Sequence, residues 1–252
     1  MNYRRLVPLL IPLSAWLVSQ VFLLVPPIFL IAVLLEIIVI FIGVKILVGK
    51  AAKRDWPLYI IAPTLFFLSF SSYAAIIVNR LAIQTIFLLT AWFLFSYFKN
   101  LYYYLSYEAP DRAVKIDYLL VSGGFLTVFA GAGVLLDLPA FINWPLWAIV
   151  VIFIPLFGLL FLQFLPFKKT TLSTSGLWLI IGTIVLTELA WVLALLPLNF
   201  NILALILAIG YYFIVSALRL EWQGHLSRRT LKYPIILSVF IILLLLLTAS
   251  WL

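Results

Sequence analysis

The chain has 252 residues, of which 67% are hydrophobic and only 10% are charged. Soluble domains carry about 25% charged residues, so sixteen basic and eight acidic side chains exclude a water-soluble globule and predict an integral membrane protein. The absence of cysteine and the single histidine exclude disulfides, thiol chemistry and multi-histidine metal sites, so neither a metal nor a cofactor is expected.

Nine apolar stretches are long enough to cross a bilayer, whose hydrocarbon core needs about 20 helical residues. They cover residues 6–25, 27–48, 57–78, 81–98, 117–136, 144–165, 177–197, 200–218 and 234–252. The sequence therefore predicts an all-α polytopic bundle of transmembrane helices in a single integral membrane domain, residues 1–252. The connections on one side are very short, whereas those on the other side, at 99–116 and 219–233, are longer.

The basic residues are distributed unevenly between the two sides. With the N-terminus placed inside, Arg80 alone lies outside and the other fifteen basic residues lie inside. The inner residues are Arg4, Arg5, Lys45, Lys50, Lys53, Arg54, Lys99, Arg112, Lys115, Lys168, Lys169, Arg219, Arg228, Arg229 and Lys232. The positive-inside rule then predicts a cytoplasmic N-terminus and an outer C-terminus. No Asn-x-Ser/Thr sequon occurs, which favours a prokaryotic source and hence the plasma membrane.

An internal repeat is one interpretation of the apolar pattern. An offset of 119 residues places Thr64 on Thr183 and aligns residues 58–61 with 177–180. Because four spans separate the copies, they would share one orientation, as parallel repeats do. The repeat halves would be residues 1–116 and 117–233, followed by a final helix at 234–252. Chance similarity between apolar segments is the alternative.

Two carboxyl groups lie far from the ends of the predicted spans. Glu36 follows Pro27 by nine residues and Glu188 precedes Pro197 by nine, so at about 1.5 Å per residue both lie about 13 Å below the outer surface. Insertion of a charge at such depth is unfavourable by roughly 2.5–3.5 kcal/mol, which makes each a functional candidate. We expect both to face the bundle interior, where they either carry a proton or cation in transport or serve only in packing.

Four further polar side chains lie within or at the end of other predicted spans. Gln20, Gln84 and Gln163 lie within spans, and Arg80 lies at the outer end of the fourth. Intramembrane amides commonly form hydrogen bonds between helices. Arg80 is a candidate outer anion gate, or a partner for an acidic side chain.

Small residues and prolines mark two other features of the spans. Gly123, Thr127 and Gly131 recur at four-residue spacing, which predicts close packing against another helix. Pro63 and Pro155 fall inside spans, where each frees a backbone carbonyl that either binds a ligand or accompanies a simple kink.

The inner connection at 219–233 contains the most varied chemistry of the chain. Its candidates for binding a lipid head group are Arg219, Glu221, His225, Arg228 and Arg229. Arginines and a histidine suit a phosphate, with the histidine as acid or base. The alternative is a segment that only anchors to anionic lipids at the cytoplasmic face.

Three functions follow from these residues. The first is a transporter or flippase-like permease that uses the buried carboxyls, with substrate entering between helices. The second is a non-catalytic membrane subunit or scaffold, whose partner would be another membrane or cytoplasmic protein. The third is a lipid-modifying enzyme at the cytoplasmic face, although no common catalytic motif occurs in the chain. Membrane lipids are the expected partners, and nucleic acid is not, because membrane topology explains the net charge of +8.

Overall fold

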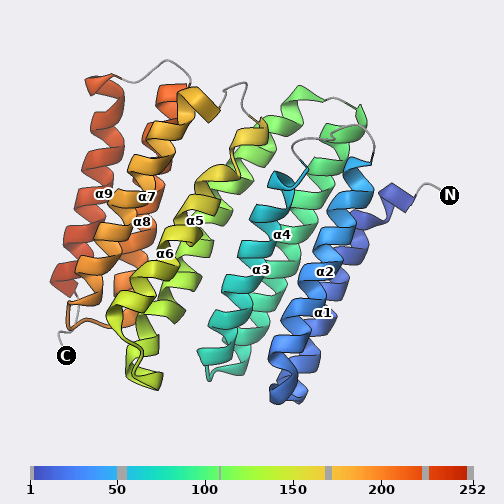
Figure 1. The fold of residues 1–252 in the computed structure, drawn as a ribbon, viewed down its shortest axis with the longest axis horizontal. Helices are drawn as coiled ribbons and strands as arrows, with labels where there is room; N and C mark the ends of the chain where they lie inside the picture. The colour runs from blue at the N-terminus through green and yellow to red at the C-terminus, as the bar shows by residue number, and fades with distance from the viewer. Residues whose placement is uncertain (1–2, 50–55, 108, 168–171, 223–226, 249–252) are drawn as a thin grey trace. The chain divides into compact units, whose positions relative to one another are not determined.

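The computed structural model describes residues 3–49, 56–107, 109–167, 172–222 and 227–248, which form helices and turns (Figure 1). The long helices are α1 (Val7–Leu24), α2 (Phe29–Val48), α3 (Leu58–Ile76), α4 (Arg80–Tyr107), α5 (Pro110–Ile142), α6 (Leu146–Leu162), α7 (Leu172–Ala194), α8 (Phe200–Trp222) and α9 (Arg228–Thr248). The short 3₁₀ helices are η1 (Tyr3–Arg5), η2 (Pro26–Ile28) and η3 (Leu165–Phe167). The chain forms two compact units, Met1–Gly124 and Phe125–Leu252.

Eight helices within the described ranges, α1 to α8, are long and apolar enough to cross a membrane. The chain is therefore an integral, multi-pass membrane protein. The apolar part of α9 is Ser238–Leu247, which is shorter than a span, and residues 249–252 of the ninth predicted stretch lie outside the described residues. The ninth span, the sidedness of the termini and the internal repeat remain predictions.

Two helices extend far beyond the apolar stretches that predicted them. α4 continues to Tyr107 and α5 begins at Pro110, so most of the connection expected at 99–116 is helical. Hydropathy identifies only the part of a helix that lies in hydrocarbon, whereas tyrosines and charged residues continue these two helices outside it. The result is a helical hairpin in which Arg112 N–H donates to the carbonyl of Ala109 at 3.0 Å.

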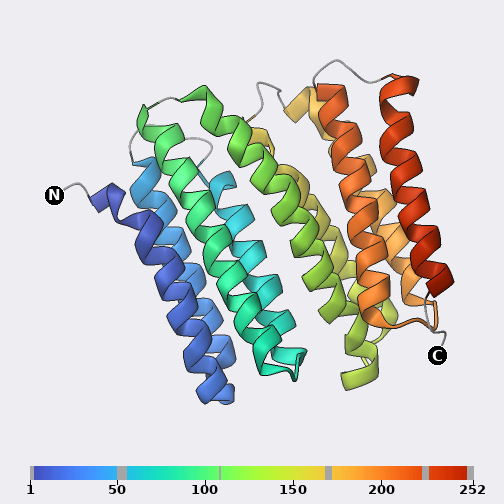
Figure 2. The same cartoon turned by 180° about the vertical axis from the view of Figure 1, so that it is seen from behind.

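The first unit is built on a ring of four helices. α1 packs against α2 and α4, and α3 completes the ring by packing against the same two helices. Consecutive helices run in opposite directions, as the two opposite views show (Figures 1 and 2). Buried residues recur every three or four positions along α2, at Val33, Glu36, Ile40, Gly43 and Leu47. Glu36 therefore belongs to the packed face of its helix.

Aromatic rings fill the interface between α3 and α4. The Phe66 and Phe93 rings stack with centroids 3.8 Å apart, and Phe70 stacks on Phe66 at 4.4 Å. A Cβ atom added at Gly123 would overlap the Phe93 ring, so α5 approaches α4 closely at this glycine. Gly123, Thr127 and Gly131 are all buried. The contact of Gly123 with Phe93 agrees with the predicted close packing at that position, and the helix that would pack against Thr127 and Gly131 remains a prediction.

Pro63 in α3 has a specific partner in α4. A proline has no N–H, so Pro63 leaves the carbonyl of Tyr59, four residues earlier, without its helical donor. The fully buried Tyr97 hydroxyl donates to that carbonyl at 2.8 Å. The freed carbonyl is therefore used in helix packing rather than for a ligand.

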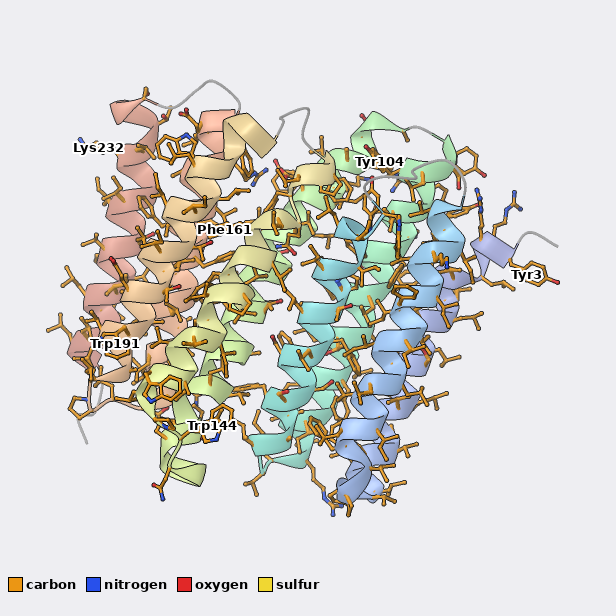
Figure 3. The ribbon with its side chains drawn as sticks, viewed as in Figure 1. Tyr3, Tyr104, Trp144, Phe161, Trp191 and Lys232 are labelled. Carbon is orange, nitrogen blue, oxygen red and sulfur yellow. The ribbon has the colours of Figure 1, made fainter. Side chains whose placement is uncertain are left out.

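The second unit pairs neighbouring helices in chain order, with α7 between α6 and α8, and α9 against α8. Gly182 on α7 lies close to both neighbouring helices. An added Cβ at this position would lie 3.1 Å from the Phe161 ring of α6 and 3.2 Å from Ile214 of α8. Phe161, labelled in Figure 3, also stacks on the Tyr211 ring with centroids 5.8 Å apart. These contacts bring α6, α7 and α8 together.

Candidate functional site

Glu36 is buried in the first unit, as expected for a carboxyl within a span. Its exposed fraction is 0%, and its Oε1 lies 3.0 Å from the Ser14 hydroxyl of α1. Its Oε2 is buried and has no hydrogen-bond partner among the described residues. Ser14 was not identified from the sequence, because a single serine 22 residues from Glu36 gives no signal of its own.

Ser14 has two acceptors for one hydroxyl proton. Its Oγ lies 2.8 Å from the carbonyl of Ile11 and 3.0 Å from Glu36 Oε1. If the proton goes to Ile11, only a protonated Glu36 can complete the second hydrogen bond by donating to Ser14. If Glu36 is ionised, Ser14 must turn its proton toward the carboxylate. The protonation state of Glu36 and the direction of the Ser14 hydrogen bond are thus linked.

Glu188 does not share this environment. It is exposed on the second unit, and whether it faces the interior of the bundle remains a prediction. The buried positions of α7 include Leu186 and Ala190, and at about 100° per residue Glu188 lies about 200° from each of them. Counting residues from a span end predicts depth but not the side of the helix.

The Glu188 side chain lines a groove of about 430 Å³ between α6 and α7. Thr187 and Trp191 lie beside it on α7, and Val150 closes the groove from α6. Trp191 is labelled in Figure 3. The groove therefore combines one carboxyl and one hydroxyl with apolar walls.

The three predicted amides all have partners. Gln20 on α1 and Gln84 on α4 exchange two hydrogen bonds, from each Nε2 to the opposite Oε1, at 2.8 and 3.0 Å. Gln163 is buried at the end of α6, where its Nε2 donates to the Tyr211 hydroxyl at 3.4 Å. These amides join helices, as predicted for intramembrane carboxamides.

Arg80 is the first residue of α4 and is exposed. Asn79, which precedes it, caps the helix: its Oδ1 accepts the N–H of Leu81 at 2.9 Å and of Ala82 at 3.3 Å. The asparagine therefore has a structural role. A gating role for Arg80, or a pairing with an acidic side chain, remains a prediction.

The predicted head-group cluster at 219–233 is only partly described. Arg219 and Glu221 lie in the last turn of α8 and are half-buried. His225 lies outside the described residues, and the side chains of Arg228 and Arg229, at the start of α9, also lie outside them. The assembly of this cluster therefore remains a prediction.

Glu221 also borders an apolar groove of about 320 Å³ formed by α7, α8 and α9. Trp178, Ile181, Gly182 and Phe213 provide part of its lining. A second apolar groove lies between α6 and α7, where Gly158 and Gly176 carry no side chain. Grooves of this lining suit hydrocarbon chains better than polar solutes.

The N-terminal turn is joined to the far end of α4. Arg5 in η1 forms a hydrogen bond with Tyr102, which raises the pKa of the guanidinium. In the same region Arg112 lies 4.9 Å from the centre of the Tyr103 ring and donates to Asn100 Oδ1 at 3.2 Å. The sequence placed Asn100, Tyr102, Tyr103 and Arg112 only in the longer connection at 99–116, because their contacts depend on the continuation of α4 and α5 as helices.

No group of three His, Asp or Glu side chains that could hold a metal ion occurs in the part of the chain that the structure describes. Comparison with known proteins identifies no relative: no protein-family model, no curated protein and no solved structure matches this chain.

Proposed function

We propose that the protein is a flippase-like permease for an amphiphilic substrate and that Glu36 is its proton-carrying group. The observation that carries this proposal is the complete burial of the Glu36 carboxyl, with one oxygen beside Ser14 and the other without a partner among the described residues. A buried carboxyl with an unsatisfied oxygen is unfavourable in a membrane interior. The presence of such a group at Glu36 therefore favours a functional role for it.

A change in Glu36 protonation would alter the contact between α1 and α2. Ser14 belongs to α1 and Glu36 to α2, and these helices pack tightly enough that a Cβ at Gly43 would overlap Ile11. Ionisation would require the Ser14 hydroxyl to leave Ile11, and would favour entry of water or a cation to the carboxylate. Proton binding could thereby be coupled to movement of one helix against the other.

The apolar grooves support an amphiphilic substrate. The grooves at Trp178 and at Gly158 are almost entirely apolar and lie along helices that are long enough to span the membrane. Substrate would enter between helices, with its hydrocarbon part in such a groove and its head group near an end. Glu188 lines a further groove of the second unit and is the second carboxyl of this proposal.

The proposal includes an orientation. Arg80 lies at the N-terminal end of α4, and Arg4, Arg5 and Arg112 lie at the opposite end of the first unit. We place that opposite end in the cytoplasm by the positive-inside rule, in the plasma membrane of a prokaryote.

The test is lipid translocation in liposomes that contain the purified chain. Fluorescent phosphatidylglycerol in the inner leaflet is followed by dithionite quenching as it reaches the outer leaflet, with and without a pH gradient. We expect translocation faster than in protein-free liposomes, loss of its pH-gradient dependence in Glu36→Gln, and a reduced rate in Glu188→Gln. Asp111→Asn, which changes an exposed acid in the first turn of α5, is the matched control.

If liposomes that contain the wild-type protein translocate phosphatidylglycerol no faster than protein-free liposomes, the permease proposal is contradicted. An unchanged response to the pH gradient in Glu36→Gln would contradict the role of Glu36 alone.

A non-catalytic membrane subunit is the second candidate. It is favoured by the pairing of the intramembrane amides, since Gln20 with Gln84 and Gln163 with Tyr211 use their polar groups within the protein. Under this function, Glu36→Gln and Glu188→Gln would change stability at most, and affinity purification from the native membrane would recover a partner protein in fixed ratio.

A further inference from the structure

A polar groove of about 310 Å³ lies between α4 and α5 in the first unit. Ser96 and Asn100, one turn apart on α4, form one wall. The other wall belongs to α5 and consists of Lys115, Tyr118, Leu119 and Ser122, which share one face of that helix. This groove, called the α4–α5 groove below, shares no lining residue with the apolar grooves of the second unit and does not include Glu36.

The position of the α4–α5 groove along the helices matches a membrane interface. Asn100 lies about 30 Å along α4 from Arg80, the first residue of that helix, at about 1.5 Å per residue. That distance equals the thickness of the hydrocarbon core, so Arg80 and Asn100 lie at opposite interfaces. Ser96 and Ser122 lie one to two turns deeper than Asn100 and Lys115, so the groove extends from the interface toward the hydrocarbon.

Two groups in the α4–α5 groove can bind an anion. The Lys115 side chain is exposed, and its ammonium has no hydrogen bond or ion pair among the described residues. The Asn100 carboxamide has a fixed orientation, because its Oδ1 accepts from Arg112 at 3.2 Å and its Nδ2 donates to the carbonyl of Ser96 at 2.7 Å. The second hydrogen of Nδ2 remains available.

The surrounding charge also favours an anion. Arg112 brings its guanidinium to Asn100 while packing over the Tyr103 ring. The N-terminal end of α5, with its partial positive charge, lies one to two turns from Lys115. Among the described residues, the acidic side chains near this groove in the sequence are Asp111, in the first turn of α5, and the buried Asp117.

We propose that the α4–α5 groove binds the phosphate group of an anionic phospholipid, with Lys115 and Asn100 as its ligands. Arg112 is a positioning residue, which holds the Asn100 amide with its nitrogen toward the groove. The acyl chains extend past Leu119 and Ser122 into the hydrocarbon. This site does not depend on the proposed permease function, and it lies outside the 219–233 connection where sequence reasoning placed the head-group candidates.

The test measures lipid binding to the full-length chain in detergent by native mass spectrometry. Phosphatidylglycerol, phosphatidylcholine and inorganic phosphate are titrated separately. We expect phosphatidylglycerol to bind more tightly than phosphatidylcholine, and Lys115→Gln to weaken phosphatidylglycerol binding about fivefold, as expected for one basic residue near a lipid charge. Lys99→Gln removes the same charge outside the α4–α5 groove and is expected to leave binding nearly unchanged.

Two further variants separate binding from folding. Lys115→Arg keeps the charge and is expected to retain phosphatidylglycerol binding, whereas Ser122→Leu fills the deeper part of the groove and is expected to weaken it without any change of charge. Equal losses in Lys99→Gln and Lys115→Gln, or unchanged binding in Ser122→Leu, would overturn the proposal. Binding of inorganic phosphate with the same dependence on Lys115 would also overturn it, because the ligand would then be a soluble phosphate.

Discussion

Gln20 and Gln84 face each other across the α1–α4 interface and exchange two hydrogen bonds, at 2.8 and 3.0 Å. Each carboxamide gives one N–H and receives one at its oxygen, so neither presents an unsatisfied group toward its partner. The residues are 64 positions apart in the chain, and they tie the first helix to the fourth. This pair closes the helix ring of the first unit at a polar contact.

Replacement of either glutamine should remove both hydrogen bonds together. At about 0.6 kcal/mol for each intramembrane hydrogen bond, Gln20→Ala and Gln84→Ala should show a coupling energy of about 1 kcal/mol in a double-mutant cycle. The measurement is the free energy of unfolding in a titration of detergent-solubilised protein with SDS. Thr85 is the control, because its hydroxyl bonds within α4 to the carbonyl of Leu81. Gln20→Ala and Thr85→Ala should be additive, and additivity of the glutamine pair would contradict the observed exchange.

The Tyr97 hydroxyl should matter because Pro63 is present. Tyr97→Phe keeps the ring but leaves the carbonyl of Tyr59 without a donor, which should lower the free energy of unfolding by about 1–3 kcal/mol. Pro63→Ala restores an N–H that can bond to the same carbonyl. Tyr97→Phe should therefore be less destabilising in the Pro63→Ala background. An equal loss in both backgrounds would show that the hydrogen bond does not act through this carbonyl.

A methyl group at Gly123 should be tolerated poorly. An added Cβ overlaps the Phe93 ring, and that ring cannot withdraw freely because Phe66 stacks on it at 3.8 Å. Gly123→Ala should lower the free energy of unfolding by about 1–3 kcal/mol through overpacking. Gly158 in α6 is a matched helical control, since an added Cβ there meets no atom within 4 Å. Gly158→Ala should be neutral or stabilising, and the same SDS titration compares the two variants.

Apolar length was sufficient to predict eight of the long helices, because burial in hydrocarbon requires about 20 consecutive apolar residues whatever the packing. It was not sufficient to predict where α4 and α5 end. Their polar continuations contain Asn100 and Lys115, which the sequence assigned to a connection and which form the α4–α5 groove. A hydropathy pattern contains no information about a helix that continues beyond the membrane.

Side-chain direction was the other quantity that the sequence left undetermined. Glu36 and Glu188 have similar depths by residue count, but one is fully buried and the other is exposed on its unit. The hydrophobic residues around each helix leave no polar face from which the buried side could be identified. The pairing of Gln20 with Gln84 was undetermined for the same reason, although both had been recognised as amides within spans.

The membrane orientation can be tested independently of stability. A reporter fused after Leu252 should behave as extracytoplasmic, because the positive-inside rule places fifteen of the sixteen basic residues in the cytoplasm and the nine predicted spans then end outside. Alkaline phosphatase should be active at this position and green fluorescent protein should not fluoresce. A fluorescent fusion would contradict either the ninth span or the assigned orientation. Single cysteines at Arg80 and at Lys99 separate these two cases, because the assigned orientation requires their labelling from the outer and the inner side, respectively.

The contact between Ser14 and Glu36 should have different consequences for stability and for transport. Ser14→Ala removes the only hydrogen-bond partner of the Glu36 carboxyl among the described residues, and should lower the free energy of unfolding by about 1 kcal/mol. Glu36→Gln keeps an oxygen that can accept from Ser14, so it should unfold at nearly the wild-type SDS concentration. If Glu36 is a proton carrier, Glu36→Gln should nevertheless abolish the pH-gradient dependence of lipid translocation, whereas Ser14→Ala should retain it. A Glu36→Gln variant that is strongly destabilised, with transport lost only in proportion to the folded protein, would instead assign Glu36 to packing between α1 and α2.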